Sequence, residues 1–326
     1  MATPKTLLDI LDRVTTPEIA APEALSLTTA KHYERVRTIF EDENIVGAGI
    51  AKKIAGDQLT EELGIIFYVR QKIPAADLRP DQLLPPVLAA RNGMAVYTDV
   101  IEIGDVVPQN GPNIQNTPIQ SGFSVGYKDQ ATGTLGAIVR KRGKQYLLSN
   151  SHVFADAGLG RVGDSIIFPG PDDGGAAPGS LVATLDSFTP FAVGETYTNR
   201  VDAALAKLEP AALARLDMTI LGAATPIKVG TPVRDMKVTK RGRTTGDTQS
   251  VVRDVDFRIL VRYDGVGVVG FTGQVLCNTY TAGGDSGSIV VDQDSGAIVG
   301  LHFAGSSHGS VFTPIRTVME ALKFKF

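Results

Sequence analysis

Short apolar segments separated by glycine-containing turns make up most of the chain after Ser121. Segments of this length and spacing are typical of strands in a β-barrel or a β-sandwich, so this part of the chain is expected to be mainly β. The closing segment Pro314–Phe326 places Ile315, Val318 and Leu322 on one face and predicts a C-terminal helix. The expected strands are Gly122–Tyr127, Thr134–Lys141, Gln145–Ser149, Leu181–Ser187, Val201–Leu208, Val233–Lys240, Gly265–Thr272, Ser288–Asp292 and Ala297–Phe303.

The beginning of the chain follows a different pattern, which predicts a small α+β region. Thr3 and Pro4 are suited to the N-cap and first position of an opening helix, and leucines follow at helical spacing. A second helix is expected over Glu23–Glu43. The expected strands are Ile45–Ile54, Ile65–Arg70 and Met94–Ile103.

A stretch rich in proline and side-chain amides lies between Gly104 and Ser121 and separates the two patterns. It carries three prolines and shows no helical period, which is typical of a linker. The sequence therefore predicts two domains. Residues 1–115 form the α+β module with its linker, and residues 116–326 form the β-rich domain.

Composition narrows the possible partners and the compartment. The formal net charge of −3 provides no overall basic field that would neutralise phosphates, so nucleic acid is not an expected partner. Cys277 is the only cysteine, so no intramolecular disulfide can form, which favours a reducing compartment. We find no signal peptide or membrane span in the sequence and expect a cytoplasmic protein.

The segment Gly-Gly-Asp-Ser-Gly-Ser, which contains Ser286, stands immediately before an apolar strand. Glycine on both sides of Asp285-Ser286 would let backbone amides approach a reacting carbonyl closely, as a nucleophilic serine requires. A tight β-turn without any catalytic role would have the same composition. The interpretation of Ser286 as a nucleophile therefore depends on finding its partners.

Such a serine needs a base, and imidazole has an unperturbed pKa near physiological pH. His152 lies between the apolar segment YLLSNS and the turn VFADAG, where a side chain can be aimed across a cleft. Asp202 is a lone acid at the start of an apolar strand, and a buried carboxylate there could hold the imidazole in one tautomer. A turn histidine and a strand-capping aspartate remain the structural alternatives.

The motifs LLSNSHVF, NRVDAALAKL and GGDSGS, in this order, resemble the catalytic motifs of the chymotrypsin/trypsin superfamily, especially its bacterial branches. The run VTKRGRTTGDTQSVV is similar to a strand pair in the second barrel of streptogrisin-like proteases. The resemblance covers Ser121 to Phe326 and implies a trypsin-like double β-barrel. It also implies that Ser286 is the nucleophile, His152 the general base and then acid, and Asp202 its orienter. This chemistry needs no cofactor or metal.

The same resemblance implies further site residues. The amides of Gly284 and Ser286 would form the oxyanion hole. Counting six residues back from the nucleophile places Tyr280, followed by Thr281, at the base of the substrate pocket, where no acid supports a preference for Lys or Arg. His302 stands where glutamate-specific bacterial proteases place a histidine against the substrate carboxylate, and a packed strand histidine is the alternative.

The N-terminal segments NIVGAGIAKK and TDVIEIGDV resemble the leader of intracellular trypsin-like proteins of the plant Narrow Leaf 1 family. This resemblance implies a regulatory or assembly module and either a homo-oligomer or a regulatory protein partner. Ile45-Val46-Gly47 also mimics the N-terminus that activation cleavage releases in many trypsin-like enzymes to pair with the acid before the nucleophile, here Asp285. A strand suits it better, and the sequence does not reveal which group holds Asp285.

The functional prediction is a serine endopeptidase acting on proteins or peptides. The alternative is a binding or scaffold protein with a protease fold, or a latent protease whose cleft the first 115 residues occlude until a partner binds.

Overall fold

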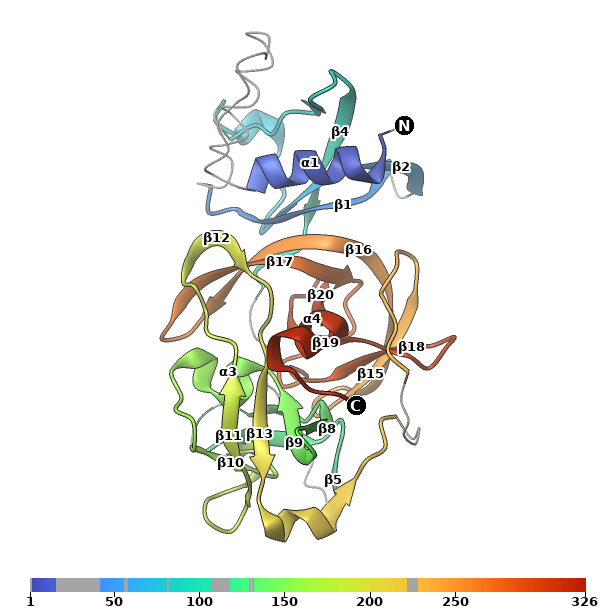
Figure 1. Ribbon diagram of the computed structural model, residues 1–326. Coiled ribbons are helices and arrows are strands. Elements are labelled where there is room, and N and C mark those ends of the chain that lie inside the picture. The colour runs from blue at the N-terminus through green and yellow to red at the C-terminus, as the bar shows by residue number, and fades with distance from the viewer. Residues whose placement is uncertain are drawn as a thin grey trace.

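The computed structural model describes residues 2–15, 42–55, 58–80, 82–106, 118–128, 130, 132–221 and 228–326. Strands dominate these residues, as expected, and the N-terminal elements lie at one end of the molecule (Figure 1). The helix expected over Glu23–Glu43 falls almost wholly outside the described residues. Within the described ranges, no helix has the length and apolar character needed to cross a membrane.

The first sheet has seven strands in the order β7-β6-β10-β11-β13-β9-β8. Only Leu135 and Gly136 separate β7 from β8, so this one run of chain borders both β6 and β9 and closes the sheet into a barrel. The amide of Leu135 donates to Phe123 O and that of Gly136 to Leu148 O, each at 2.8 Å. The strands are β6 Ser124–Tyr127, β7 Thr132–Thr134, β8 Ala137–Lys141, β9 Lys144–Ser149, β10 Ser165–Ile167, β11 Leu181–Phe188 and β13 Ala204–Leu208.

The second barrel is closed by one long strand, β16, which extends over Gly246–Tyr263. Its first part pairs with β15 and the rest with β17, which completes the ring β15-β16-β17-β20-β19-β18. The expected trypsin-like double barrel is therefore present. The other strands are β15 Lys237–Gly242, β17 Gly267–Cys277, β18 Ile289–Asp292, β19 Ile298–Gly305 and β20 Ser310–Pro314, with β12 Gly194–Asn199 added in parallel to β17.

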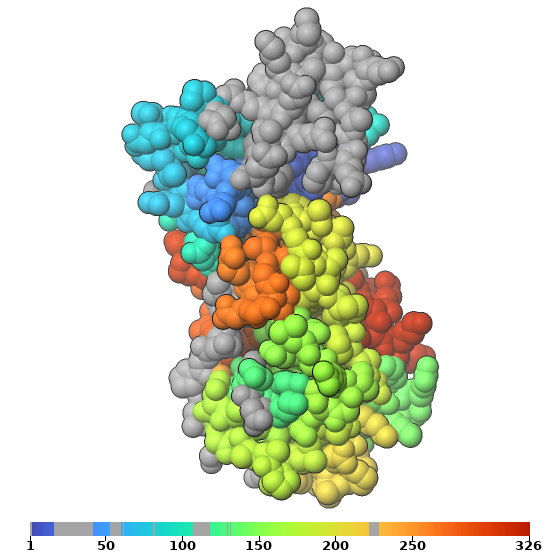
Figure 2. Space-filling view, turned by 90° about the vertical axis from the view of Figure 1, so that its left-hand side faces the viewer, coloured from blue at the N-terminus to red at the C-terminus, as the bar shows by residue number. Residues whose placement is uncertain are grey.

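The N-terminal strands continue this second sheet. Strand β1 pairs with β16, with Gly47 opposite Ile259 and Ala48 opposite Arg258, and β2, β4 and β3 follow in that order. The space-filling view shows the N-terminal residues directly against the orange and yellow surface of the second barrel (Figure 2). The bounds are β1 Ile45–Ala55, β2 Gln58–Val69, β3 Val87–Ala89 and β4 Ala95–Glu102.

Two helices pack against this sheet. Helix α1, Pro4–Thr15, begins as predicted, because the amide of Thr6 donates to Thr3 Oγ1 at 3.3 Å, and its apolar face packs on β1 and β2. The predicted C-terminal helix is α4, Ile315–Leu322, and it packs in a cluster that draws on both barrels. The remaining elements are β5 Ile119–Gln120 paired with β14 Leu216–Asp217, helix α3 Ser151–Phe154, and the 3-10 helices η1 Ala75–Asp77, η2 Asp156–Gly158, η3 Pro171–Asp173 and η4 Pro210–Arg215.

Candidate active site

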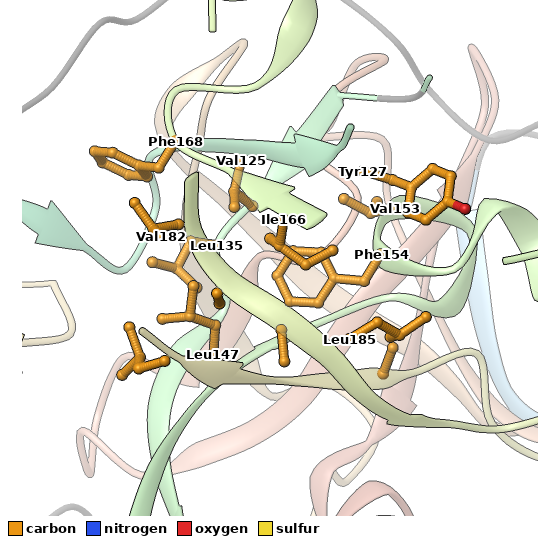
Figure 3. Close-up of a cluster of buried hydrophobic side chains, with 14 of the residues drawn as sticks. Val125, Tyr127, Leu135, Leu147, Val153, Phe154, Ile166, Phe168, Val182 and Leu185 are labelled. Atoms are coloured by element: carbon orange, nitrogen blue, oxygen red, sulfur yellow. The ribbon is translucent and has the colours of Figure 1, made fainter. Parts of the chain in front are cut away.

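His152 is carried by the four-residue helix α3, directly after strand β9. Its neighbours Val153 and Phe154 point into the core of the first barrel and pack in one cluster with Ile166 and Leu185 (Figure 3). Two buried side chains therefore anchor so short a helix. The His152 side chain is 6% exposed.

Four hydrogen-bond donors surround the carboxylate of Asp202, which is fully buried. Its Oδ1 accepts from the backbone amides of Ser151 at 2.7 Å and His152 at 3.2 Å. Its Oδ2 accepts from Nδ1 of His152 at 2.5 Å and from the hydroxyl of Tyr263 at 2.9 Å. Because a carboxylate can only accept, the proton of the imidazole lies on Nδ1. Nε2 is left with its lone pair, as a general base requires.

Ser286 lies in the turn before β18 and is 1% exposed. Strand β7 of the first barrel holds this turn, since Thr134 donates its amide to Ser286 O at 2.8 Å and its hydroxyl to Gly284 O at 2.7 Å. A Cβ added at Gly133 would lie 2.5 Å from Val153 and 2.8 Å from Ser286 O. The nucleophile candidate and the helix that carries His152 therefore approach the same point of β7.

The hydroxyl of Ser286 does not contact the base in this structure. Its Oγ donates to the carbonyl of Phe303 at 3.2 Å. Among the residues that the structure describes, Nε2 of His152 has no hydrogen-bond partner. The serine side chain would have to turn away from Phe303 O to hydrogen-bond to Nε2 of His152.

The backbone amides of Gly284 and Ser286 have no acceptor within the described residues, whereas their neighbours are bonded. Asp285 N donates to Ala282 O at 3.1 Å, and Gly287 N donates to His302 O at 2.9 Å. Gly284 has a φ of 90°, a conformation that glycine adopts readily. Two unused donors therefore flank Asp285, and such a pair can stabilise an oxyanion.

Asp285 is held by Lys240 of β15, which the sequence did not reveal. The ammonium lies 3.0 Å from Oδ2, and both side chains are fully buried. Burial raises the pKa of Asp285, but Lys240, the Thr245 hydroxyl and the amide of Ala282 outweigh it and hold this pKa below its usual value. Ile45 pairs with Val69 inside the N-terminal sheet, so the similarity of Ile45-Val46-Gly47 to an activation terminus reflects a strand.

A second buried ion pair joins the two barrels. Arg243, in the turn between β15 and β16, makes two 2.8 Å hydrogen bonds to the carboxylate of Asp173 in η3. Its amide also donates to Thr134 Oγ1 at 3.0 Å. The glycine-flanked hairpin RGRTTG therefore supports both the inter-barrel contact and the turn that carries Ser286.

The three expected pocket residues are all buried in this structure. Thr281 Oγ1 lies 2.7 Å from Ser310 Oγ, and the ring centroids of Tyr280 and His302 are 6.3 Å apart. Burial lowers the pKa of His302 to about 3, so its imidazole is neutral at physiological pH. In this arrangement His302 offers no positive charge to a substrate carboxylate, and the role of all three residues in substrate binding stays a prediction.

Residues 131–301 match the family described as the trypsin-like peptidase domain. The chain belongs to this family. Among curated proteins, the chain is 24% identical over 311 residues to Protein NARROW LEAF 1 of Oryza sativa subsp. japonica, an alignment that covers 81% of the chain and 51% of the relative. The chain therefore spans about half the length of that relative.

Three solved structures illustrate what the chain resembles in fold. Protease A of Thermobifida fusca is 18% identical with a TM-score of 0.45, covering 64% of this chain and 97% of its own. The chymotrypsin of Cellulomonas bogoriensis is 12% identical with a TM-score of 0.42 and the same coverage. A glutamic acid specific serine protease, described as using a histidine triad in substrate binding, is 18% identical with a TM-score of 0.44, covering 63% and 98%.

Proposed function

We propose that this trypsin-like peptidase is a serine endopeptidase that hydrolyses peptide bonds through an acyl-enzyme intermediate. The observation that carries the proposal is the set of donors around Asp202. They hold a buried carboxylate against Nδ1 of His152 at 2.5 Å and leave Nε2 available as a base. Burying a carboxylate is costly unless it is paired, and here its partners are those that a catalytic base needs.

In the proposed reaction, Ser286 Oγ attacks the carbonyl carbon of the scissile bond while Nε2 of His152 takes its proton. The developing oxyanion accepts hydrogen bonds from the amides of Gly284 and Ser286, each contributing about 2.7–4 kcal/mol to transition-state stabilisation. His152 then gives the proton to the leaving amine, and the acyl-enzyme forms. Water, deprotonated by His152, releases the acid and restores the serine.

The second candidate is a latent peptidase or a binding protein with a protease fold. The orientation of Ser286 favours it, because Oγ donates to Phe303 O and the side chain is almost inaccessible. In a latent enzyme, a substrate or partner would turn the hydroxyl toward His152. In a binding protein, the hydroxyl would stay turned away.

A fluorophosphonate probe, which reacts with activated serines, tests these candidates. We expect labelling at Ser286 that Ser286→Ala abolishes, with peptidase turnover lowered at least about 10⁴-fold, because triad members act as a unit. Ser307→Ala is the matched control, because Ser307 Oγ lies 2.8 Å from Nδ1 of the exposed His308 and forms a serine–histidine pair outside the site. Labelling that appears only with cell extract supports latency. Absence of labelling in both conditions refutes the endopeptidase.

Location and assembly form the remaining part of the proposal. We place the protein in the cytoplasm, because its single cysteine, Cys277, is buried and cannot form an intramolecular disulfide. We assign residues 1–115 to regulation or assembly, through a homo-oligomer or a regulatory protein partner. A peptide-library cleavage profile would define the preferred substrate side chain.

A further inference from the structure

Tyr263 is a tyrosine of the second barrel whose hydroxyl donates to the candidate triad aspartate at 2.9 Å. We infer that Tyr263 is a positioning residue for the triad. It fixes Oδ2 of Asp202 and thereby sets how strongly this carboxylate orients His152 and stabilises its imidazolium form. The inference rests on the proposed function, because it assigns Tyr263 a part in the same reaction.

The two oxygens of Asp202 are held in different ways. Oδ1 accepts from two backbone amides of α3, the helix that also carries His152. Oδ2 accepts from two side chains, His152 and Tyr263. Tyr263 is therefore the partner of Oδ2 that does not belong to the catalytic base, and its loss would leave that oxygen held by His152 alone.

The surroundings of Tyr263 keep its hydroxyl protonated and its ring in place. Burial, and then the charge of Asp202, raise the pKa of this phenol well above its ordinary value, so it remains a donor at physiological pH. The ring packs at centroid distances of 4.9 Å from Phe191 and 6.3 Å from Phe271. It lies 5.8 Å from the His152 ring, tilted by 50°. A fixed donor of this kind can pre-organise a carboxylate.

Tyr263 is also the last residue of β16, the strand on which the N-terminal sheet is built. Strand β1 pairs with β16 at Ile259, four residues before Tyr263. The hydroxyl thus connects a second-barrel strand to the aspartate of the first barrel, across the line where the two barrels meet. A shift of β16 would therefore move the Tyr263 hydroxyl relative to the carboxylate of Asp202.

Removing the hydroxyl should have two effects on the reaction. The carboxylate would be less rigidly held, so His152 would be less precisely oriented for proton transfer, and kcat would fall more than substrate binding would weaken. The carboxylate would also lose a neutral donor and interact more strongly with the imidazolium. His152 would then keep its proton to higher pH. The acidic limb of the plot of kcat/KM against pH would therefore move to higher pH.

The test compares Tyr263→Phe with the unchanged protein on a peptide substrate. We expect kcat to fall at least about tenfold, the lower end of the effect of one hydrogen bond to a charged group, with KM changed less than about twofold. The acidic limb of the kcat/KM profile should move to higher pH. The matched control is Tyr127→Phe, because Tyr127 is a buried tyrosine whose hydroxyl donates to Asp164 in the first barrel, outside the site. It should leave kcat and the profile unchanged.

A second substitution keeps the test decisive if Tyr263→Phe does not fold. Introducing 3-fluorotyrosine at position 263 preserves the ring and strengthens the donor, so the acidic limb should move to lower pH. A folded Tyr263→Phe protein with unaltered kcat and pH profile, or a fluorotyrosine protein with an unmoved limb, overturns the inference alone. An unchanged protein that neither cleaves peptides nor labels with the probe overturns the proposed function and the inference with it.

Discussion

Replacing Lys240 by methionine would leave the carboxylate of Asp285 buried without its cation. The ammonium lies 3.0 Å from Oδ2, and breaking a buried pair on one side typically costs about 3–5 kcal/mol. The carboxylate would keep four other donors. Its Oδ1 accepts from the backbone amides of Thr244 and Thr245, and its Oδ2 accepts from the amide of Ala282 and the hydroxyl of Thr245. Because these donors remain, we expect Lys240→Met to lower the free energy of unfolding by about 3 kcal/mol.

The same substitution should slow labelling of Ser286. Oδ2 of Asp285 accepts from Ala282 N at 2.9 Å, so the carboxylate folds the turn that presents the amides of Gly284 and Ser286. A carboxylate that has lost its cation would move toward water or take up a proton, and the turn would follow it. We therefore expect the fluorophosphonate labelling rate to fall together with stability.

Urea unfolding and the probe reaction measure both effects, and the neighbouring residue supplies the control. Arg241, next to Lys240 on β15, pairs with Asp247 of β16 at 2.7 and 2.6 Å. Both side chains are partly exposed, so Arg241→Met should cost less than about 1 kcal/mol. Adding Asp285→Asn to Lys240→Met should recover much of the loss, because no unpaired charge remains. A Lys240→Met protein as stable as Arg241→Met would refute the reasoning.

Two further predictions concern the joint between β1 and β16. Burial raises the pKa of Asp254 to about 7, so the folded protein keeps this proton after the unfolded chain has lost it near pH 4. Stability therefore falls by up to about 4 kcal/mol as pH rises from about 4 to about 7. Asp254→Asn should therefore gain stability over the natural protein from pH 5 to pH 8 in urea unfolding, and a pH-independent difference would contradict this. A Cβ at Gly47 would lie 2.2 Å from Arg258 O, so Gly47→Ala should cost about 1–3 kcal/mol in the same assay. Gly179→Ala, at an uncrowded position, should cost nothing measurable, and equal losses at the two glycines would rule out the clash.

The barrel strands and the closing helix could be predicted because their signals are local. Short runs of apolar residues mark β9, β13 and β19, and an apolar face marks α4. The expected strand Thr134–Lys141 is divided in the structure, since β7 ends at Thr134 and β8 begins at Ala137. The division follows from barrel closure, because the chain must leave β6 and join β9 within two residues. Such a change of partner depends on strands far away in the sequence.

The second half of β16 carries a sequence pattern that predicts a long strand. Phe257, Ile259, Val261 and Tyr263 alternate with less buried residues, as a strand with one buried face requires. The expected strand pair around RGRTTG covered only the first half. With the whole strand assigned, Tyr263 would have been placed on the buried face, although its contact with Asp202 spans 61 residues and could not have been predicted.

Lys240 was missed for a similar reason. It falls between Val238 and Gly242 on the buried face of β15, and a lysine at such a position needs an anionic partner. The similarity of Ile45-Val46-Gly47 to an activation terminus was set aside in favour of a strand, and the group that holds Asp285 was left open. The buried-face position of Lys240 in β15 would have indicated a partner without reference to any family.

The glycines of NIVGAGIAKK acquire a physical explanation in the structure. Gly47 and Gly49 are two residues apart in β1, so both face the same side of the strand. A Cβ at Gly47 would lie 2.2 Å from Arg258 O, and one at Gly49 would lie 1.9 Å from the carboxylate of Asp254. Both glycines therefore allow β1 to approach β16 more closely than any other residue would. Since β16 ends at Tyr263, the motif that sets the N-terminal sheet on the second barrel acts on the strand that reaches the triad.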